Sequence, residues 1–314
     1  MQIRLLDPAG DLNLIVAFLA RVVREPPSQE ALRATLTADV QLRRLTAIAD
    51  GGGTLVGYCS ITRLASAPIG QATLWAATHP QYRQQGIATA LCHDAYTFLR
   101  TRQLTDLRSQ IEADDHTSLM FAQRRGFTID RHFFRSTLDL QRFDATPFQS
   151  AINDARTQGI AFTTLAALGD TTTTRRRVYE LNKVTAADIP GRGPFFSFEE
   201  YEQHRFGHAG YCAEGVILAI DDVQWVGLTQ LSIHPENHFA FNEMTGVIRE
   251  YRGKHIAQAL KLLAISYAQA QQMPMLRTFN DSANMAIIAM NRKFGYQPES
   301  GFYFMRAASP WEPQ

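Results

Sequence analysis

Hydrophobic residues recur along the first half of the chain with two alternating spacings. In Leu12–Val23 and Gln29–Leu36 they lie three or four residues apart, the period of a helix with one buried face. Shorter apolar runs bounded by turns, such as the one at Gly51–Gly53, predict strands. These strands are Gln2–Leu6, Arg44–Ala49, Thr54–Ile61, Ala72–Thr78, Leu107–Ile111 and 132–140, with further helices opening at Gly86 and over 115–125.

The second half shows the same order of elements. A helix from Pro147 to Gln158 is predicted to join the halves, and the four threonines before Arg175–Arg177 suggest a capped helix start. An irregular loop over 188–194 precedes a short acidic helix at Phe198–Gln203. The predicted strands are Ile160–Leu165, Val216–Ile220, Trp225–Ile233, Ala240–Val247 and Leu276–Phe279, and the main helix carries Ile256, Leu260, Leu263 and Tyr267 on its apolar stripe.

The two halves are related by an internal repeat. Three landmarks recur at nearly constant offsets of 169 to 170 residues, which indicates a duplicated domain. We therefore predict domains at 1–145 and 146–314, with the boundary in Leu138–Ser150. The landmarks are Tyr82–Leu91 with Tyr251–Leu260, Gly126-Phe127 with Gly295-Tyr296, and Gly57 with Gly227.

The composition is that of a globular chain with balanced charge. Hydrophobic residues make up 45% of the 314 residues, and 31 Lys and Arg oppose 30 Asp and Glu. This balance argues against a protein that binds nucleic acid or an anionic membrane by charge. The apolar run Leu14–Ala20 is too short to span a bilayer, and the first residues do not resemble a secretory signal. Three scattered cysteines favour buried free thiols in a cytoplasmic protein, and nothing indicates an oligomeric state.

The segment Arg83–Ala88 carries the clearest candidate chemistry. It joins a predicted strand to a helix, whose first turn offers unpartnered N–H groups and a positive dipole end to a phosphate or diphosphate. Gly86 lets an anion approach the backbone, and Arg83 can contact a phosphate directly. An ordinary strand–helix connection is the alternative, but the duplicated context and the Gly-aromatic pair 40 residues later favour phosphate binding.

This pattern resembles the GNAT superfamily of acyl-CoA-dependent N-acyltransferases. The resemblance rests on Arg/Gln-x-x-Gly-x-Gly/Ala at the start of the central helix, followed by a strand, a helix and Gly-Phe or Gly-Tyr. Two copies covering nearly the whole chain resemble the tandem two-domain members of that superfamily. The resemblance implies an α/β (α+β) fold, with two domains that each hold a mixed, mostly antiparallel sheet flanked by helices.

The resemblance also implies that acetyl-CoA lies in a V-shaped opening between the fourth and fifth strands of a copy. Two departures bear on this assignment. His255 replaces the motif glycine and is expected to crowd a diphosphate, and the tyrosine that commonly protonates the thiolate is replaced by Ala122 and Asn291. The coenzyme-binding residues implied are Thr78, Arg83, Gln84, Gln85, Gly86, Ile87, Ala88 and Thr89 in the first copy, and Val247, Arg252, Gly253, Lys254, His255, Ile256 and Ala257 in the second.

Polar residues suited to the transfer gather in the second copy. Strand alternation predicts that Phe241, Glu243, Thr245 and Val247 share one face, whereas the matching positions of the first copy hold no carboxylate. Glu243 is therefore our candidate for the group that takes the proton of the amine, directly or through water. A solvated strand residue is the equally weighted alternative.

Three amide side chains follow in the same copy. Asn280 ends the fifth strand, and Asn284 and Asn291 lie seven residues apart on the next helix, so they face the same way. They can bind the peptide-like groups of pantetheine or the leaving sulfur, although capping by Asp281 or Ser282 is the plainer role of this cluster. In the first copy we expect Asp115 to cap a helix.

Two histidine motifs are set aside. His204 and His208 lie four residues apart near glutamates, but Gly207 interrupts the helix and the zinc-protease pattern is absent. His79 and His234 each precede a proline at a strand end, where a turn is the expected role.

We expect an acetyl-CoA-dependent N-acetyltransferase that acts on a primary amine of a small molecule or peptide, without a metal, and with catalysis by Glu243 and Asn291 of the second copy. Two working sites are an alternative arrangement. The alternative function is a non-catalytic tandem GNAT module that binds CoA or a partner as a sensor or scaffold. The acceptor pocket is expected in loops 24–30 and 186–200, whose residues do not identify the amine.

Overall fold

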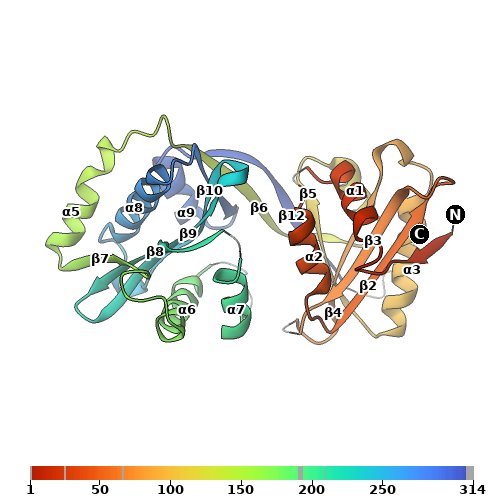
Figure 1. Ribbon diagram of the computed structural model, residues 1–314, viewed down its shortest axis with the longest axis horizontal. Helices are drawn as coiled ribbons and strands as arrows, with labels where there is room; N and C mark the ends of the chain where they lie inside the picture. Colours follow the sequence, from red (N-terminus) through yellow and green to blue (C-terminus); the bar gives the residue numbers. More distant parts are fainter. Residues whose placement is uncertain (1, 25, 66, 190–193, 209, 309–314) are drawn as a thin grey trace. The chain divides into compact units, whose positions relative to one another are not determined.

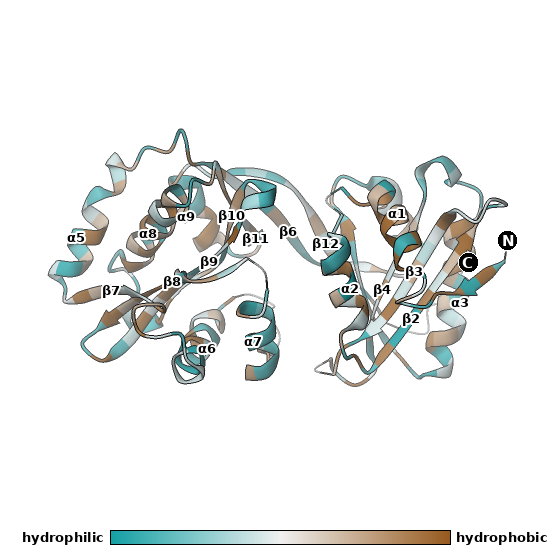
Figure 2. Ribbon diagram, in the orientation of Figure 1, coloured by the Kyte–Doolittle hydropathy of each residue, from teal (hydrophilic) through white to brown (hydrophobic). Residues whose placement is uncertain are grey.

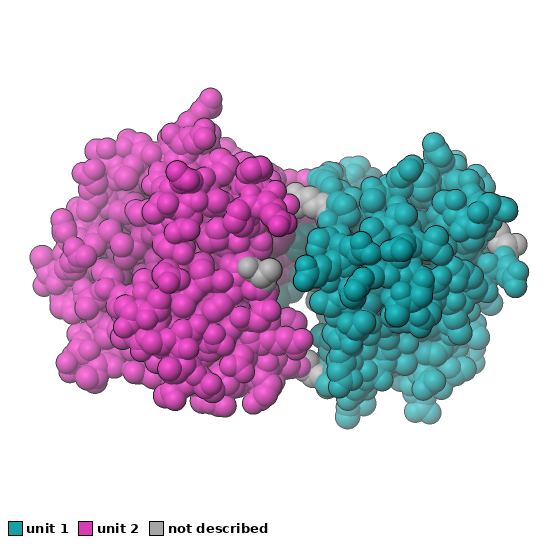
Figure 3. Space-filling view, viewed as in Figure 1, with its two compact units in different colours: residues 1–131, 302–314 teal, residues 132–301 magenta. Residues whose placement is uncertain are grey.

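The computed structural model describes residues 2–308, apart from residues 25, 66, 190–193 and 209. The chain forms two compact units, which Figure 3 distinguishes by colour: unit 1 comprises residues 1–131 and 302–314, and unit 2 comprises residues 132–301. Among the described residues no helix has the length and apolar character needed to cross a membrane.

In unit 1 the strands form a mostly antiparallel sheet in the order β1-β2-β3-β4-β5-β12. The β4–β5 pair is parallel, and the others are antiparallel. The strands are β1 (Ile3–Leu5), β2 (Leu42–Ala49), β3 (Leu55–Arg63), β4 (Gln71–Thr78), β5 (Asp106–Glu112) and β12 (Gln297–Ala308). The helices are α1 (Leu12–Val22), α2 (Gln29–Thr37), α3 (Ile87–Thr101) and α4 (His116–Gln123), with a 3-10 turn η1 (Pro80–Tyr82).

Helices cover both faces of the unit 1 sheet, as the alternation of its strands requires. On one face, Ile15 and Phe18 of α1 pack in a core with Tyr58 of β3. On the other face, Leu91 of α3 packs with Cys59 of the same strand. Adjacent residues of β3 therefore enter different cores.

Unit 2 repeats this plan in the order β6-β11-β10-β9-β8-β7, with a parallel β10–β11 pair among antiparallel neighbours. Its strands are β6 (Thr128–Asp139), β7 (Ile160–Thr164), β8 (Tyr211–Asp221), β9 (Gln224–His234), β10 (Phe239–Val247) and β11 (Met275–Asp281). The helices are α5 (Gln149–Thr157), α6 (Thr172–Ala186), α7 (Phe198–Arg205), α8 (Ile256–Ala270) and α9 (Met285–Lys293), with 3-10 turns η2 (Thr146–Phe148), η3 (Pro235–Asn237) and η4 (Arg249–Tyr251).

The sheet of unit 2 lies between two helical layers, with α5 and α8 on one face and α6 and α7 on the other (Figure 1). Figure 2 shows apolar residues concentrated along strands such as β8 and β9. Leu218 and Leu228 of these strands and Leu260 of α8 are completely buried in one core.

The final strands are exchanged between the two sequence halves. Phe302–Ala308 of β12 pairs with β5 of unit 1, and residues 133–139 of β6 pair with β11 of unit 2. Met305 and Ala307 are accordingly buried in the core of unit 1, although they end the second repeat. The compact units therefore divide at residues 131 and 301, whereas the domain boundary at 145/146 stays a prediction from the repeat.

The predicted fold class is confirmed, and most predicted elements lie within a few residues of the observed ones. Two features differ. Strand β12 was not predicted, and β8 is longer than the predicted Val216–Ile220 because it begins at Tyr211 and contains an irregular pairing between Tyr211 and Val216. Of the predicted loop over 188–194, residues 190–193 lie outside the described part of the chain.

Candidate active site

Both units hold an opening between their two parallel strands, as the resemblance implies. In unit 2 the described pairs of β10 and β11 are confined to Phe239–Phe241 with Met275–Arg277, after which β10 continues without a β11 partner. In unit 1 the described pairs end likewise at Gln71–Thr73. Each strand therefore offers main-chain groups to a ligand along its open edge.

A β-bulge in β10 sets unit 2 apart. Asn242 pairs with Leu231 and Met244 with Gln230, so Glu243 is the extra residue on its strand. The predicted common face of Phe241, Glu243, Thr245 and Val247 is therefore wrong, because one inserted residue reverses the alternation. Glu243 contacts α7, whereas the hydroxyl of Thr245 bonds to Asn242, which contacts α8 on the opposite face.

Glu243 lies in a cluster of polar side chains from α7 and β9. Its Oε2 is 2.5 Å from Nη1 of Arg205, and its Oε1 accepts the hydroxyl of Ser232 at 2.7 Å. Ser232 Oγ is also 3.0 Å from Nε2 of His234. Because the single hydroxyl hydrogen goes to Glu243, His234 donates from Nε2 and keeps its acceptor lone pair on Nδ1. The hydrogen-bonded chain runs from Glu243 through Ser232 to His234.

Two half-buried histidines complete this cluster. The rings of His208 and His234 are stacked with centroids 6.5 Å apart. Burial lowers the pKa of both imidazoles below the ordinary value of 6.5, although the charge of Glu243 partly opposes the shift. Both rings are therefore neutral at pH 7 and able to accept a proton.

The structure brings two of the three predicted asparagines together. Asn291 donates to Oδ1 of Asn280 at 2.6 Å, and Asn280 donates to Ser136 of β6 at 2.8 Å. Asn280 and Asn291 are buried, and Oδ1 of Asn291 has no hydrogen-bond partner among the described residues. Asn284 lies apart from them as the N-cap of α9, accepting from the N–H of Ile287, so it and not Asp281 or Ser282 caps the helix.

The predicted diphosphate loops of the two units share one backbone conformation. Gly86 is the N-cap of α3 with φ 79°, and His255 is the N-cap of α8 with φ 59°. Two positions earlier, Gln84 (φ 61°) and Gly253 (φ 77°) are also left-handed. The glycine has thus changed place within the loop while the loop kept its shape, and the His255 side chain is exposed.

Neighbouring side chains fix these loops. Tyr82 donates to Asp50 at 3.1 Å and Tyr251 to Asp221 at 2.7 Å, so the repeated tyrosine ties each loop to a strand hairpin. The other predicted loop residues are exposed, half-buried or, in Ile87 and Ile256, buried in the core. In unit 2, Arg252 donates to the carbonyl of Val247 at 3.1 Å and pairs with Asp188 at 2.7 Å.

The opening of unit 1 carries fewer polar groups. The regular β4 has no counterpart of the inserted Glu243, and Ala122 stands where unit 2 has Asn291 at the repeat offset. The hydroxyl of Thr78 is buried without a hydrogen-bond partner among the described residues. Asp115 caps α4 by accepting from the N–H of Ser118, which confirms its expected role.

The cluster around Glu243 was only partly predicted. No sequence pattern joins Arg205, Ser232 and His208 to Glu243, although Ser232 and His234 lie two residues apart on one face of the strand. His234 is the N-cap position of η3, but its ring also belongs to this cluster. His79, in contrast, has the expected turn role, because its Nδ1 accepts from the N–H of Gln81.

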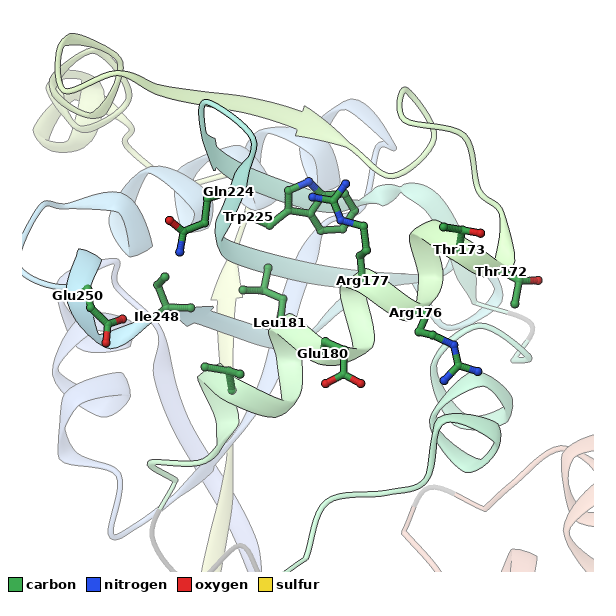
Figure 4. Close-up of a pocket in the computed structure, with 11 residues that line it drawn as sticks. Thr172, Thr173, Arg176, Arg177, Glu180, Leu181, Gln224, Trp225, Ile248 and Glu250 are labelled. Carbon is green, nitrogen blue, oxygen red and sulfur yellow. The ribbon is translucent and has the colours of Figure 1, made fainter.

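A separate pocket of about 690 Å³ lies along α6 (Figure 4). Arg177 lies over the ring of Trp225 at 4.1 Å, and Leu181 and Ile248 add apolar surface. The pocket borders η4 but contains none of the predicted site residues. Among the described residues, no three His, Cys, Asp or Glu side chains are grouped as a metal site would require.

Residues 16–127 and 175–296 match the model of the Acetyltransferase (GNAT) family. A curated relative, mycothiol acetyltransferase of Stackebrandtia nassauensis, is 25% identical over 253 residues, covering 79% of this chain and 78% of the relative.

Two solved structures share the fold over nearly the whole chain. The tandem GNAT protein from the clavulanic acid biosynthesis pathway has a TM-score of 0.74 at 22% identity, covering 99% of both chains. A GCN5-related N-acetyltransferase from Sphaerobacter thermophilus has a TM-score of 0.73 at 17% identity, covering 98% of this chain and 95% of the other.

Proposed function

The chain belongs to the GNAT family of N-acetyltransferases, and on that premise we propose that it transfers the acetyl group of acetyl-CoA to a primary amine in the opening between β10 and β11 of unit 2. The observation that carries the choice of unit is Glu243. It projects from the bulge beside this opening, whereas the regular register of β4 leaves unit 1 with no residue in its place.

The residues of the opening fit acetyl-CoA. The N-cap of α8 makes no side-chain hydrogen bond, so the first-turn N–H groups of Ile256, Ala257 and Gln258 are available to the diphosphate. The open edge of β10 matches the peptide-like groups of pantetheine, and the free Oδ1 of Asn291 can accept from an amide N–H or from the thiol. Unit 1 offers the same loop with Gly86 and is proposed as a second coenzyme-binding site.

When bound, the coenzyme would supply a thioester, whose acyl C–S bond is replaced by a bond from carbon to the amine nitrogen, while CoA leaves as the thiolate and takes up a proton. The chain holds the amine beside this group and removes its proton, since only a neutral nitrogen is nucleophilic. Glu243 accepts this proton directly or through water, while Arg205 and Ser232 fix the carboxylate. The neutral ring of His234 donates from Nε2 to the hydroxyl of Ser232, and it thereby holds that hydroxyl toward Glu243.

The acceptor is proposed to be a primary amine of a small molecule or peptide. The curated relative named mycothiol acetyltransferase supports a small-molecule acceptor. Arg205 is the last residue of α7. The segment 186–200, which leads into the first turn of this helix, is proposed to form a wall of the acceptor pocket. Residues 190–193 of this segment lie outside the described part of the chain.

The test compares binding with turnover. Acetyl-CoA and desulfo-CoA should both raise the melting temperature, and thiol release with acetylated product should follow for members of an amine panel. Without stabilisation by either compound, coenzyme binding is ruled out. Binding without thiol release for any amine would instead support the alternative of a non-catalytic module that binds CoA as a sensor or scaffold.

A further inference from the structure

The back of the β10 bulge is held by one buried side chain. Asn242 is 3% exposed, and its Nδ2 lies 3.0 Å from both the hydroxyl of Thr229 and the carbonyl of Gln230. It is also 3.1 Å from the carbonyl of Met244, on the far side of the extra residue. The Oδ1 accepts from the hydroxyl of Thr245 at 3.1 Å. One amide therefore links both sides of the bulge to the neighbouring strand.

A buried lysine supports this amide from α8. Lys261 is 1% exposed, and its Nζ donates to Oδ1 of Asn242 at 3.0 Å. The Nζ also lies 4.6 Å from the centroid of the Tyr296 ring. Burial lowers the pKa of Lys261 to about 7, because the charged amine loses its hydration in this position. An apolar side chain at this position would avoid the cost of desolvating an amine. The presence of a lysine therefore indicates that its amine has a specific role.

Unit 1 has neither the pair nor the bulge. By its pairing with the preceding strand, Leu74 corresponds to Asn242, and at the repeat offset Cys92 corresponds to Lys261. Leu74 is buried in an apolar core, and β4 pairs with β3 from Gly57 to Thr62 without a shift of register. The same fold is therefore built without the pair, so its presence in unit 2 is tied to the bulge and not to the sheet itself.

We propose that Asn242 and Lys261 are positioning residues of the transferase site, holding the β10 bulge so that Glu243 faces Arg205 and Ser232. This rests on the proposed function of unit 2. Neither residue touches the reacting atoms; they act through the strand. Thr278 adds a link from β11, because its hydroxyl donates to the carbonyl of Asn242 at 2.9 Å where the two strands diverge.

A mutant cycle tests the link to Glu243. Lys261→Met keeps the length of the side chain but removes the donor, and it should lower kcat about tenfold through misplacement of Glu243, without changing the Kd of acetyl-CoA. In a Glu243→Gln background the same substitution should cause little further loss, whereas a merely structural role would give additive losses. Lys261→Gln, which keeps a donor, should retain more of kcat. Tyr296→Phe is the matched buried control, because its hydroxyl has no partner among the described residues.

Hydrogen exchange of the free protein separates this proposal from the proposed function. Amides of residues 242–247 should exchange faster in Lys261→Met and in Asn242→Leu than in the wild type, while those of β3 and β4 in unit 1 should not change. Unchanged exchange at 242–247 in both variants would overturn the proposal, as would additive losses in the cycle. Absence of thiol release from the wild type would instead contradict the proposed function, and the exchange result would still decide the role of the pair.

Discussion

At Glu243 the geometry of a single residue depends on three elements. The bulge turns the side chain toward α7, Arg205 supplies the opposite charge, and Ser232 of β9 fixes the second oxygen. Both partners are half-buried or buried, so these contacts are less screened by water than a surface ion pair would be.

Replacing the carboxylate tests its role as a base. Glu243→Gln keeps the shape but removes the proton acceptor, so kcat/KM for the amine should fall by about 100-fold or more while the Kd of acetyl-CoA stays unchanged. Steady-state thiol release and calorimetry measure the two quantities. Glu214→Gln, at an exposed position of β8, serves as the control. Full activity in Glu243→Gln would exclude the carboxylate as the base.

The histidines predict a pH dependence with a definite sign. Because burial lowers the pKa of His234 and His208 below 6.5, both rings lose their charge before neutral pH is reached from the acid side. The acid limb of kcat/KM should therefore lie below pH 6.5, with no loss at pH 7 from this source. His234→Gln should lower the rate and change that limb. A wild-type limb centred above pH 6.5 would contradict the assignment.

Single residues of the site could be predicted only where the two repeats can be compared position by position. Glu243 could be predicted because the alignment of the two repeats places it opposite Leu74. Arg205 lies 38 positions away, on a helix that the alignment of the repeats did not include. Asn284 shows the opposite limit: its spacing from Asn291 suggested a common helix face, yet it precedes the first turn and caps it.

At the scale of elements, the loops before α3 and α8 show that one backbone shape tolerates different sequences. Both have left-handed residues at the same two positions, with glycine at the second in unit 1 and at the first in unit 2. A residue with a side chain is destabilised by about 1–2 kcal/mol in this left-handed conformation, and this applies to both His255 and Gln84. The sequence predicted the loops from their glycines but could not predict that His255 would adopt the glycine conformation.

Substitutions in these loops should have opposite effects on stability. His255→Gly relieves the left-handed side chain and should raise the free energy of unfolding by up to about 1 kcal/mol, after the entropy of glycine in the unfolded chain is subtracted. It should also tighten acetyl-CoA binding if the side chain crowds the diphosphate. Gly86→Ala should lower stability by a similar amount. Gly51→Ala, where φ is not positive and a Cβ meets nothing within 4 Å, is the control for denaturant unfolding. Destabilisation by His255→Gly would contradict this explanation.

The bulge in β10 is a local feature that the sequence pattern did not predict. Strand alternation predicts a regular β10. A glycine within a strand often indicates a bulge, but the bulge of β10 occurs at Asn242 and Glu243, which carry no such signal. The extra residue is accommodated by side chains from β9, β11 and α8, which come together only in the folded sheet.

At the scale of the whole molecule, the exchange of final strands links the two repeats. Each unit completes its sheet and core with residues of the other half of the sequence. The internal repeat predicts two similar domains but gives no indication of which copy receives each final strand, since the two strands occupy equivalent places.

This exchange predicts that a residue of the second repeat stabilises the first unit. Met305→Ala removes a fully buried side chain from the unit 1 core and should lower the free energy of unfolding of that unit by about 2–5 kcal/mol. Trp75 fluorescence reports on unit 1 in a background where Trp225 and Trp311 are replaced by phenylalanine. Met120→Ala, 52% exposed in the same unit, is the control. An unchanged Trp75 transition in Met305→Ala would contradict the exchange.

A crystal structure of the protein with acetyl-CoA tests most directly where the transfer takes place. We predict the coenzyme in the opening between β10 and β11, with its diphosphate at the first-turn amides of α8 and its acetyl end beside Glu243. Acetyl-CoA bound in unit 1 alone, or in neither opening, would contradict the assignment of catalysis to unit 2.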